Sequence, residues 1–162
     1  MNARPYVSVV GPGEATPAQM EAAERIGRRL AAAGAIVVCG GLGGVMAAAC
    51  RGAASAGGLT VGILPGSDRK GANEWVQVAV PTGMGELRNG LVVRAADAVV
   101  AVGGAYGTLS EVALALKTGV PVVGVGTWTI DGVEQVESPD DAVGRALELA
   151  HRRAGHAVGD GS

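Results

Sequence analysis

Glycine clusters that follow apolar runs are the part of this sequence best suited to chemistry. Three of them stand directly after short valine-rich runs, at residues 11–13, 40–44 and 103–107. Glycine lets the main chain approach a ligand closely and leaves its N–H groups uncovered. A helix that begins after such a loop favours an anion at its first turn. Each cluster alone is equally well explained as a tight turn, but the three together indicate a site for a phosphate-bearing molecule.

The candidate phosphate-binding residues are drawn from these clusters and from the helix start after the third. They are Gly11, Gly13, Gly40, Gly41, Gly103, Gly104, Gly107 and Thr108. Arg88 lies upstream, near the start of another predicted helix, where a guanidinium is a natural bidentate partner of phosphate. We expect Arg88 to have few other duties at that position; the alternative is an ordinary surface cation.

Glu111 is the acidic residue closest after the third cluster. Thr108 and Glu111 have the spacing of a capping box, in which both side chains satisfy free N–H groups at the start of a helix. A functional carboxylate at the site is the other interpretation, and both roles can hold together. Either way, the sequence places Glu111 in the first turn of that helix.

Several familiar sites are absent from the sequence. No GxxxxGK[ST] stretch occurs, and the first cluster reads GPGEAT, which does not fit GxGxxG. Cys39 and Gly40 stand where a dinucleotide-binding protein has its ribose-binding acid, so NAD is disfavoured. Cys39 and Cys50 form no CxxC pair, and we therefore predict neither a metal site nor a disulfide framework.

The elements that must position these residues alternate along the chain. Apolar runs predict strands at 6–10, 35–39, 59–64, 76–80, 98–102 and 122–125. Helical patterns fall between them, at 17–33, 45–56, 86–96 and 108–117, with a last one from 138 to about 153. This rhythm predicts a Rossmann-like, doubly wound parallel sheet in a three-layer α/β/α sandwich. We expect one nucleotide- or cofactor-binding domain over 1–153 and a flexible tail over 154–162, with the three glycine clusters at one edge of the sheet.

Composition narrows the functional class. The 162 residues are 48% hydrophobic and carry a net charge of −2 with no basic block, which argues against a nucleic-acid partner. No signal peptide and no apolar run of membrane-spanning length is recognised, so we expect no membrane partner and a cytoplasmic protein. The helices at 45–56 and 109–116 are apolar on more than one face, which predicts a homo-oligomer, a dimer or tetramer.

The stretch 85–111 resembles the LOG (LONELY GUY, lysine decarboxylase-like) family. The hallmark of that family is PGGxGTxxE, preceded by an Arg within an ERK triplet. Arg88 falls on the family Arg, with Leu87 and Asn89 in place of its neighbours. In the main motif Gly103 replaces Pro and Ala105 replaces the second Gly, whereas four residues match: Gly104, Gly107, Thr108 and Glu111.

Further matches resemble a subgroup, the molybdenum-cofactor carrier proteins and their bacterial relatives. They lie at 11–14, 57–65, 82–89 and 110–117, so that the resemblance covers nearly the whole chain from 7 to about 125. It implies a binding protein that stores or carries molybdenum cofactor, a pterin with a terminal phosphate. The glycine loops would cradle this small anionic ligand, and Arg88 would clamp it.

The wider LOG resemblance implies a different function. LOG proteins of this kind are phosphoribohydrolases that split a nucleoside 5′-monophosphate into a free base and ribose 5-phosphate. Glu111 would then stabilise the oxocarbenium-like transition state and Arg88 would contact the substrate, making both catalytic residues. Another nucleotide-derived ligand, such as a signalling nucleotide, is a third possibility.

Overall fold

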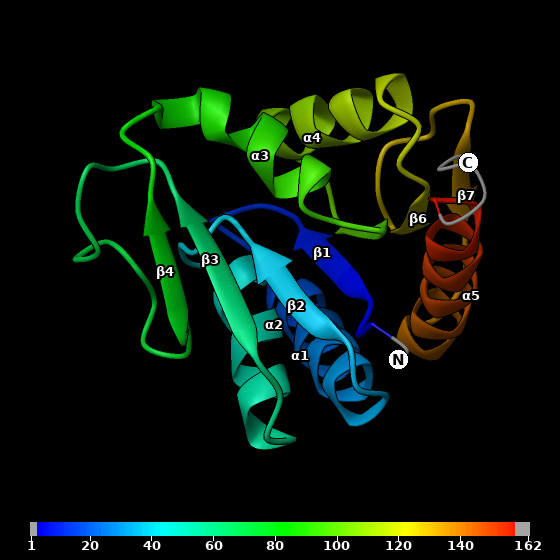
Figure 1. Cartoon of the computed structure of the whole chain (residues 1–162), viewed down its shortest axis with the longest axis horizontal. Helices are drawn as coiled ribbons and strands as arrows, with labels where there is room; N and C mark the ends of the chain where they lie inside the picture. Colours follow the sequence, from blue (N-terminus) through cyan, green and yellow to red (C-terminus); the bar gives the residue numbers. More distant parts are fainter. Residues whose placement is uncertain (1–2, 158–162) are drawn as a thin grey trace.

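A seven-stranded, entirely parallel sheet forms the centre of the computed structural model, which describes residues 3–157 (Figure 1). The strands lie in the order β4 (Val78–Pro81), β3 (Thr60–Leu64), β2 (Ile36–Cys39), β1 (Tyr6–Val10), β5 (Ala98–Val102), β6 (Val122–Val125) and β7 (Val133–Gln135). The predicted Rossmann-like class is confirmed.

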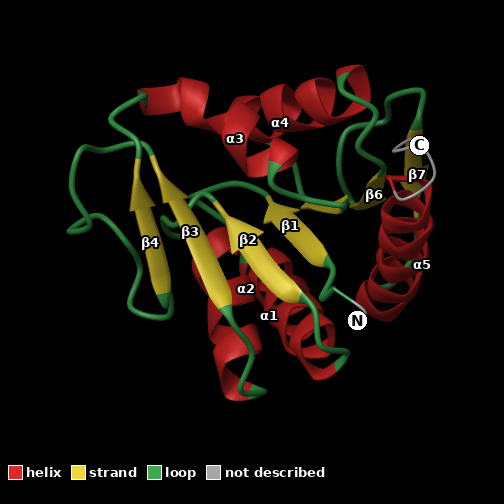
Figure 2. Cartoon of the chain, viewed as in Figure 1, coloured by secondary structure: helices red, strands yellow, loops and turns green. Residues whose placement is uncertain are grey.

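Helices cover both faces of the sheet, which makes three layers (Figure 2). One face packs against α1 (Pro17–Ala32), α2 (Val45–Ser55) and α5 (Pro139–Ala157), and the other against α3 (Asn89–Arg94) and α4 (Tyr106–Lys117). Valine and alanine dominate both cores, and β2 and β5 are buried along their whole length. In the sequence such strands are continuous apolar runs, because helices cover them on both sides.

Two glycines bring α1 and α2 into main-chain contact. A Cβ added at Gly27 would lie 2.0 Å from the carbonyl oxygen of Ala49, and one at Gly52 would lie 1.9 Å from that of Glu24. The apolar faces of α2 are therefore covered within the chain, by α1 and the sheet. The inference that the helix at 45–56 is apolar because it meets another copy is wrong for this helix.

The elements differ from the prediction in several places, among them the strand predicted at 76–80, which is β4 at Val78–Pro81. The predicted helix at 86–96 divides into a 3₁₀ turn (Gly85–Arg88) and the short α3. The strand β7 was not predicted, because only Val133 and Val136 mark it among polar neighbours. The helix α4 begins two residues earlier than expected. Finally, α5 runs on to Ala157, into the expected tail, and residues 158–162 lie outside the described residues.

The strand order reverses direction between β1 and β5. From β1 the chain winds outward through β2, β3 and β4, and from β5 it winds the other way through β6 and β7. In open α/β sheets, ligands bind beyond the carboxyl ends of the strands at this switch point, because the two following loops part there. The loops at 11–16 and 103–105 follow β1 and β5, so the topology places the first and third glycine clusters on either side of this opening.

Between residues 3 and 157 no helix is long and apolar enough to cross a membrane.

Candidate functional site

A cleft of about 280 Å³ opens at the switch point. Its walls come from the loop after β1, the start of α2 with the loop before it, the 3₁₀ turn with the first residue of α3, and the start of α4. The lining residues are Gly11, Pro12, Gly13, Leu42, Met46, Glu86, Arg88, Asn89, Ala105, Gly107, Thr108 and Glu111. Six of the ten predicted site residues therefore line one cleft.

The start of α4 presents uncapped donors to this cleft. Its N-cap residue is Ala105, which has no side chain able to cap the helix, and the first N–H groups of a helix have no partner within it. A Cβ added at Gly107 would meet open space. Thr108 is only 2% exposed, yet its hydroxyl Oγ1 has no hydrogen-bond partner among residues 3–157. This combination suits an oxygen-rich anion.

The predicted capping box is wrong. Thr108 is the third residue of α4 and cannot be its N-cap, because Ala105 holds that place in extended conformation. Glu111 is consequently the sixth residue of α4 and lies in its second turn, not in its first. The position of the helix start, two residues before the expected one, is the reason for both differences.

Arg88 is a buried anchor, and the expectation of a side chain with few other duties is wrong. It is 7% exposed. Its Nε donates to the carbonyl of Ile63 at 2.9 Å, its Nη2 to that of Gly40 at 3.3 Å, and its Nη1 to the side chain of Asn89. Burial lowers the pKa of the guanidinium, and the charge of Glu111 opposes that change. A guanidinium has five N–H donors, so two remain for a ligand in the cleft.

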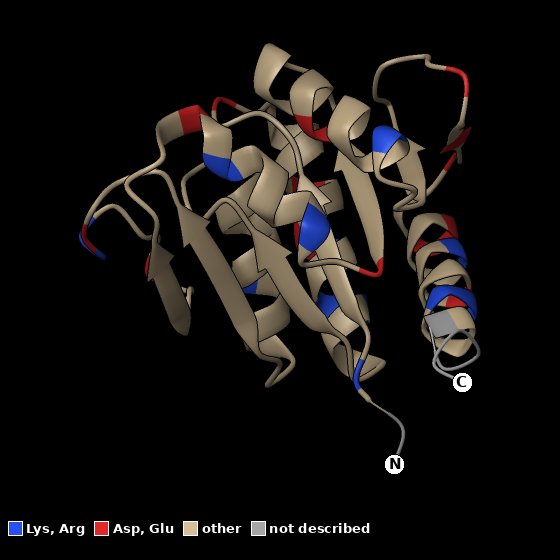
Figure 3. Ribbon diagram, turned by 45° about the horizontal axis from the view of Figure 1, so that its top comes forward, with Lys and Arg blue, Asp and Glu red and all other residues tan. Residues whose placement is uncertain are grey.

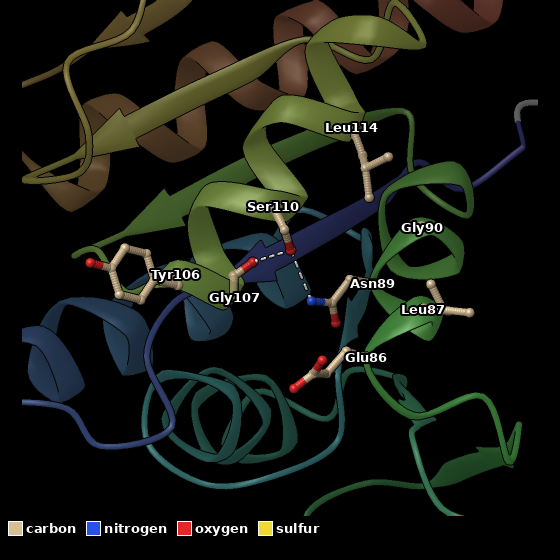
Figure 4. A pocket seen from close by; sticks show the side chains of 8 residues that line it. All are labelled: Glu86, Leu87, Asn89, Gly90, Tyr106, Gly107, Ser110 and Leu114. Carbon is tan, nitrogen blue, oxygen red and sulfur yellow. Dashed lines mark hydrogen bonds between the residues drawn. The ribbon is translucent and has the colours of Figure 1, made fainter.

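Asn89 connects Arg88 to α4, and Figure 4 shows the part of this connection that runs from Asn89 to Ser110. Its Oδ1 accepts from Arg88, and its Nδ2 donates to the hydroxyl of Ser110 at 3.1 Å. Ser110 in turn donates to the carbonyl of Gly107 at 2.7 Å. Asn89 was not among the predicted site residues, and only its place directly after Arg88 could have indicated it. The network fixes the 3₁₀ turn against the start of α4.

Glu111 is a buried carboxylic acid on the cleft wall. It is 6% exposed, and burial raises its pKa to about 7, although the charge of Arg88 acts in the other direction. Within residues 3–157, Glu111 forms no ion pair closer than 4 Å. A perturbed carboxylate in a cleft marks a candidate functional residue. At neutral pH it can hold a proton and donate it in a hydrogen bond to an anion.

The other four predicted glycines do not line the cleft and pack closely against other side chains. Gly40 lies against Arg88, and a Cβ added at Gly41 would lie 2.5 Å from the side chain of Leu64. Gly103 has a φ of +67° and packs on Gln19, while Gly104 packs on Trp128. These positions need glycine because their neighbours pack too closely for a side chain. The sequence alone does not distinguish such a glycine from one that contacts a ligand. Leu42 and Met46 line the cleft without having been predicted, since apolar side chains carry no sign of a phosphate site.

A second, larger cavity of about 490 Å³ adjoins the cleft between the 3₁₀ turn, α3 and α4 (Figure 4). The two cavities share three lining residues: Glu86, Asn89 and Gly107. Leu87, Gly90 and Leu114 give the larger cavity an apolar wall.

Among the described residues no group of three or more His, Cys, Asp or Glu side chains could hold a metal ion.

Comparison with known sequences matches residues 4–151 to the model of the SLOG cluster4 family. An uncharacterized protein of Archaeoglobus fulgidus is 41% identical over 138 residues, which cover 85% of this chain and 91% of that protein.

Two solved structures are similar over almost their whole length. The molybdenum cofactor binding protein of the phototrophic bacterium Rippkaea orientalis has a TM-score of 0.86 and 36% identity, with 91% of this chain and 98% of that chain covered. The molybdenum cofactor carrier protein of Chlamydomonas reinhardtii has a TM-score of 0.84 and 32% identity, with 92% and 99% covered. The resemblance seen in the sequence to such proteins is confirmed at the level of fold and family.

Proposed function

This chain belongs to the SLOG cluster4 family, and we propose that it binds molybdenum cofactor in the cleft at the switch point and serves as a storage or carrier protein. The observation that carries this proposal is the buried hydroxyl of Thr108, which has no partner in the described part of the chain and lies beside the uncapped start of α4. A buried hydroxyl without a partner costs free energy. A bound phosphate would supply the missing partner.

The cleft offers many donors for an anion and few groups for chemistry. The first N–H groups of α4, the hydroxyl of Thr108 and the two remaining N–H groups of Arg88 would hold the phosphate. Gly13 leaves the opposite wall open to a ligand, because a Cβ added there would come no closer than 3.9 Å to another side chain. A Cβ added at Gly11 would instead lie 2.5 Å from the carbonyl oxygen of Val102, so Gly11 serves close packing. The molybdenum centre is cargo in this proposal. The protein contributes a shielded binding site.

The similarity to cofactor-binding proteins supports this ligand class. Both similar structures named above are described by their ability to bind or carry molybdenum cofactor, and both are more than 30% identical to this chain. The altered LOG motif points the same way, because Ala105 and Asn89 stand where the hydrolase pattern has Gly and Lys.

Analysis of the released ligand tests the proposal. Freshly purified protein would be denatured and oxidised, and the supernatant examined for pterin fluorescence and, by mass spectrometry, for molybdenum. We expect pterin in near-stoichiometric amount from a host that makes the cofactor, and less from a Thr108→Val variant. A ligand pool without pterin, from protein shown to be folded by circular dichroism, would overturn the proposal.

A phosphoribohydrolase is the second candidate, favoured by the buried carboxylic acid of Glu111 in the same cleft as Arg88. Its assay is the release of ribose 5-phosphate from a panel of nucleoside 5′-monophosphates. We expect no release above the level of a Glu111→Gln variant. Turnover by the wild type that this substitution abolishes would replace the carrier proposal with the hydrolase.

We also propose that the protein forms at least a dimer, through the outer faces of α3 and α4. Leu91 and Ala113 are exposed there, and none of the ion pairs found in the described residues involves these helices. The opposite side differs: Arg25 of α1 pairs with Asp140 of α5, and charged residues of both signs alternate along α5, near the end marked C in Figure 3. Exposed Arg94 and Lys117 stand only at the last positions of α3 and α4, and the apolar residues before them are suited to contact with a second copy.

A further inference from the structure

We infer that the larger cavity beside the cleft takes a flat 2-amino-4-oxopyrimidine ring, and that Glu86 recognises the two adjacent N–H donors of that ring. This inference rests on the proposed function, because it assumes that the phosphate of the same ligand lies in the smaller cleft. Pterins and guanine share this ring edge. The site would thereby distinguish them from adenine and from simple sugar phosphates.

The two cavities form one site with two compartments. They measure about 490 and 280 Å³ and share Glu86, Asn89 and Gly107 in their walls. The smaller one has donors for an anion, whereas the larger is lined by Leu87, Gly90 and Leu114. A ligand with a phosphate at one end and a planar ring at the other matches this division, because a ring needs apolar surface on its faces and polar partners at its edge.

The carboxylate of Glu86 is unexpected in a site for an anion. Glu86 is exposed to solvent, which weakens its repulsion of an anion, but a carboxylate in this wall still favours a ligand group that carries N–H donors. Glu86 takes part in no ion pair and in no side-chain hydrogen bond within the described part of the chain, and in Figure 4 its carboxylate extends on the side of Asn89, opposite to Leu87. A carboxylate accepts two parallel hydrogen bonds. The N–H pair of a 2-amino-4-oxopyrimidine is the part of the ligand that would supply them.

The other polar side chains of the larger cavity are already engaged. Asn89 uses its oxygen for Arg88 and its nitrogen for Ser110, and the hydroxyl of Ser110 both accepts from Asn89 and donates to the carbonyl of Gly107. The ring of Tyr106 stacks on Trp128, with 6.5 Å between centroids, and in Figure 4 it points away from Glu86. Glu86 is therefore the side chain whose carboxylate oxygens remain free to accept hydrogen bonds from the edge of a ring.

The position of Glu86 is held by the same network that holds the phosphate compartment. Glu86 lies in the 3₁₀ turn two residues before Arg88, and the side chain of Arg88 fixes this turn to the carbonyls of Ile63 and Gly40. Rigid placement matters because a bidentate pair loses its strength when its geometry is loose. Ring recognition and phosphate binding thus depend on one anchored segment.

Calorimetry with four phosphate esters tests the inference on the full chain. The probes are dihydroneopterin monophosphate, GMP, AMP and ribose 5-phosphate. We expect the wild type to bind the pterin ester and GMP roughly 10- to 100-fold more tightly than AMP, as two charge-assisted hydrogen bonds imply. In Glu86→Gln, whose amide can accept only one of the two, the ratio should fall to about 3-fold or less. Glu137→Gln, an exposed acid before α5, is the matched control and should keep the wild-type ratio.

Each result has a distinct meaning. Equal affinity of the wild type for GMP and AMP, or a ratio that survives in Glu86→Gln, would overturn the ring assignment while phosphate binding stands. No binding of any ester, ribose 5-phosphate included, would overturn the proposed function and this inference with it. Tighter binding of the pterin ester than of GMP supports the cofactor as ligand. The reverse order would keep the role of Glu86 but identify a guanine nucleotide.

Discussion

The guanidinium of Arg88 occupies the space in which Gly40 would carry a side chain. A Cβ added at Gly40 would lie 2.7 Å from Nη2 of Arg88, and this same nitrogen donates to the carbonyl of Gly40 at 3.3 Å. The second glycine cluster therefore acts on the cleft through an arginine that comes 48 residues later in the chain. Glycine at this position is needed for the arginine to reach its anchors.

Gly40→Ala should displace Arg88 and weaken anion binding. The added methyl would also lie 2.9 Å from the sulfur of Met46, so neither neighbour can yield without moving a wall of the cleft. We expect the affinity for ribose 5-phosphate to fall about 10-fold, which corresponds to the loss of roughly one charge-assisted contact. Gly144→Ala in α5, where a Cβ meets open space, is the control and should bind normally. Normal binding by Gly40→Ala would contradict the proposed role of Arg88.

Arg88→Ala should lower both stability and affinity. Removing the guanidinium leaves three buried acceptors, on Ile63, Gly40 and Asn89, without the donor they have now. We expect the free energy of unfolding to drop by about 2–4 kcal/mol in urea denaturation, since each unsatisfied buried group costs on the order of 1–3 kcal/mol and water replaces part of the loss. Arg88→Lys keeps the charge but lacks the planar fork, and it should recover only part of the stability. A stable Arg88→Ala variant would show that the anchoring bonds contribute little.

Much of the fold follows from the sequence because buried parallel strands have a simple signature. The run Ala98–Val102 is apolar at every position and is buried at every position. The strand β7 lacks that signature, since it lies at the edge of the sheet and needs cover on only part of its surface. The apolar pattern does not show the break between the 3₁₀ turn and α3, which lies where Arg88 bonds to the carbonyl of Ile63 in β3 and to that of Gly40 after β2.

The site was predicted in part for a similar reason. Glycine after a strand indicates that the main chain comes close to something, but Gly13 faces the cleft while Gly103 packs on Gln19. The burial of Arg88 and its bond to Asn89 arise from tertiary contacts that sequence spacing does not encode. Glu111 was found through its motif, whereas its raised pKa depends on burial known only from the fold.

Thr108→Val should separate ligand binding from stability. Valine has nearly the shape of threonine and removes a buried hydroxyl that has no partner in the described structure. The free energy of unfolding should stay equal or rise by up to about 1 kcal/mol, while the affinity for ribose 5-phosphate falls roughly 10-fold. Thr108→Ser, which keeps the hydroxyl, should retain most of the affinity. Binding that is retained by Thr108→Val but lost by Thr108→Ser would indicate that the methyl group, and not the hydroxyl, is what the site requires.

Leu91→Asp should dissociate the proposed dimer. Leu91 is 39% exposed on α3, and a charge in the centre of an apolar contact would have to be buried without a partner. Light scattering coupled to gel filtration should show a dimer or larger assembly for the wild type and a monomer for this variant at micromolar concentration. Ala154→Asp, on the exposed side of α5, is the control and should leave the assembly intact. A monomeric wild type would refute the prediction directly.

Glu111 should make the folded protein less stable as the pH rises from about 4.5 to about 7. Burial raises the pKa of this carboxyl from its ordinary value of 4.5 to about 7, so in that interval the folded chain keeps a proton that the unfolded chain has lost. Unfolding then releases a proton, and the free energy of unfolding falls as pH increases, by about 3 kcal/mol in total from this group. Glu111→Gln cannot titrate and removes this contribution.

Urea denaturation at a series of pH values should therefore show the wild type losing stability relative to Glu111→Gln across the interval, and no further relative change above pH 8. The comparison cancels the groups that both proteins share, such as Asp140, whose pKa is lowered by its hydrogen bond with Arg25. A difference between the two proteins that is the same at pH 5 and pH 8 would mean that Glu111 titrates near its ordinary pKa and is not the buried acid of the cleft.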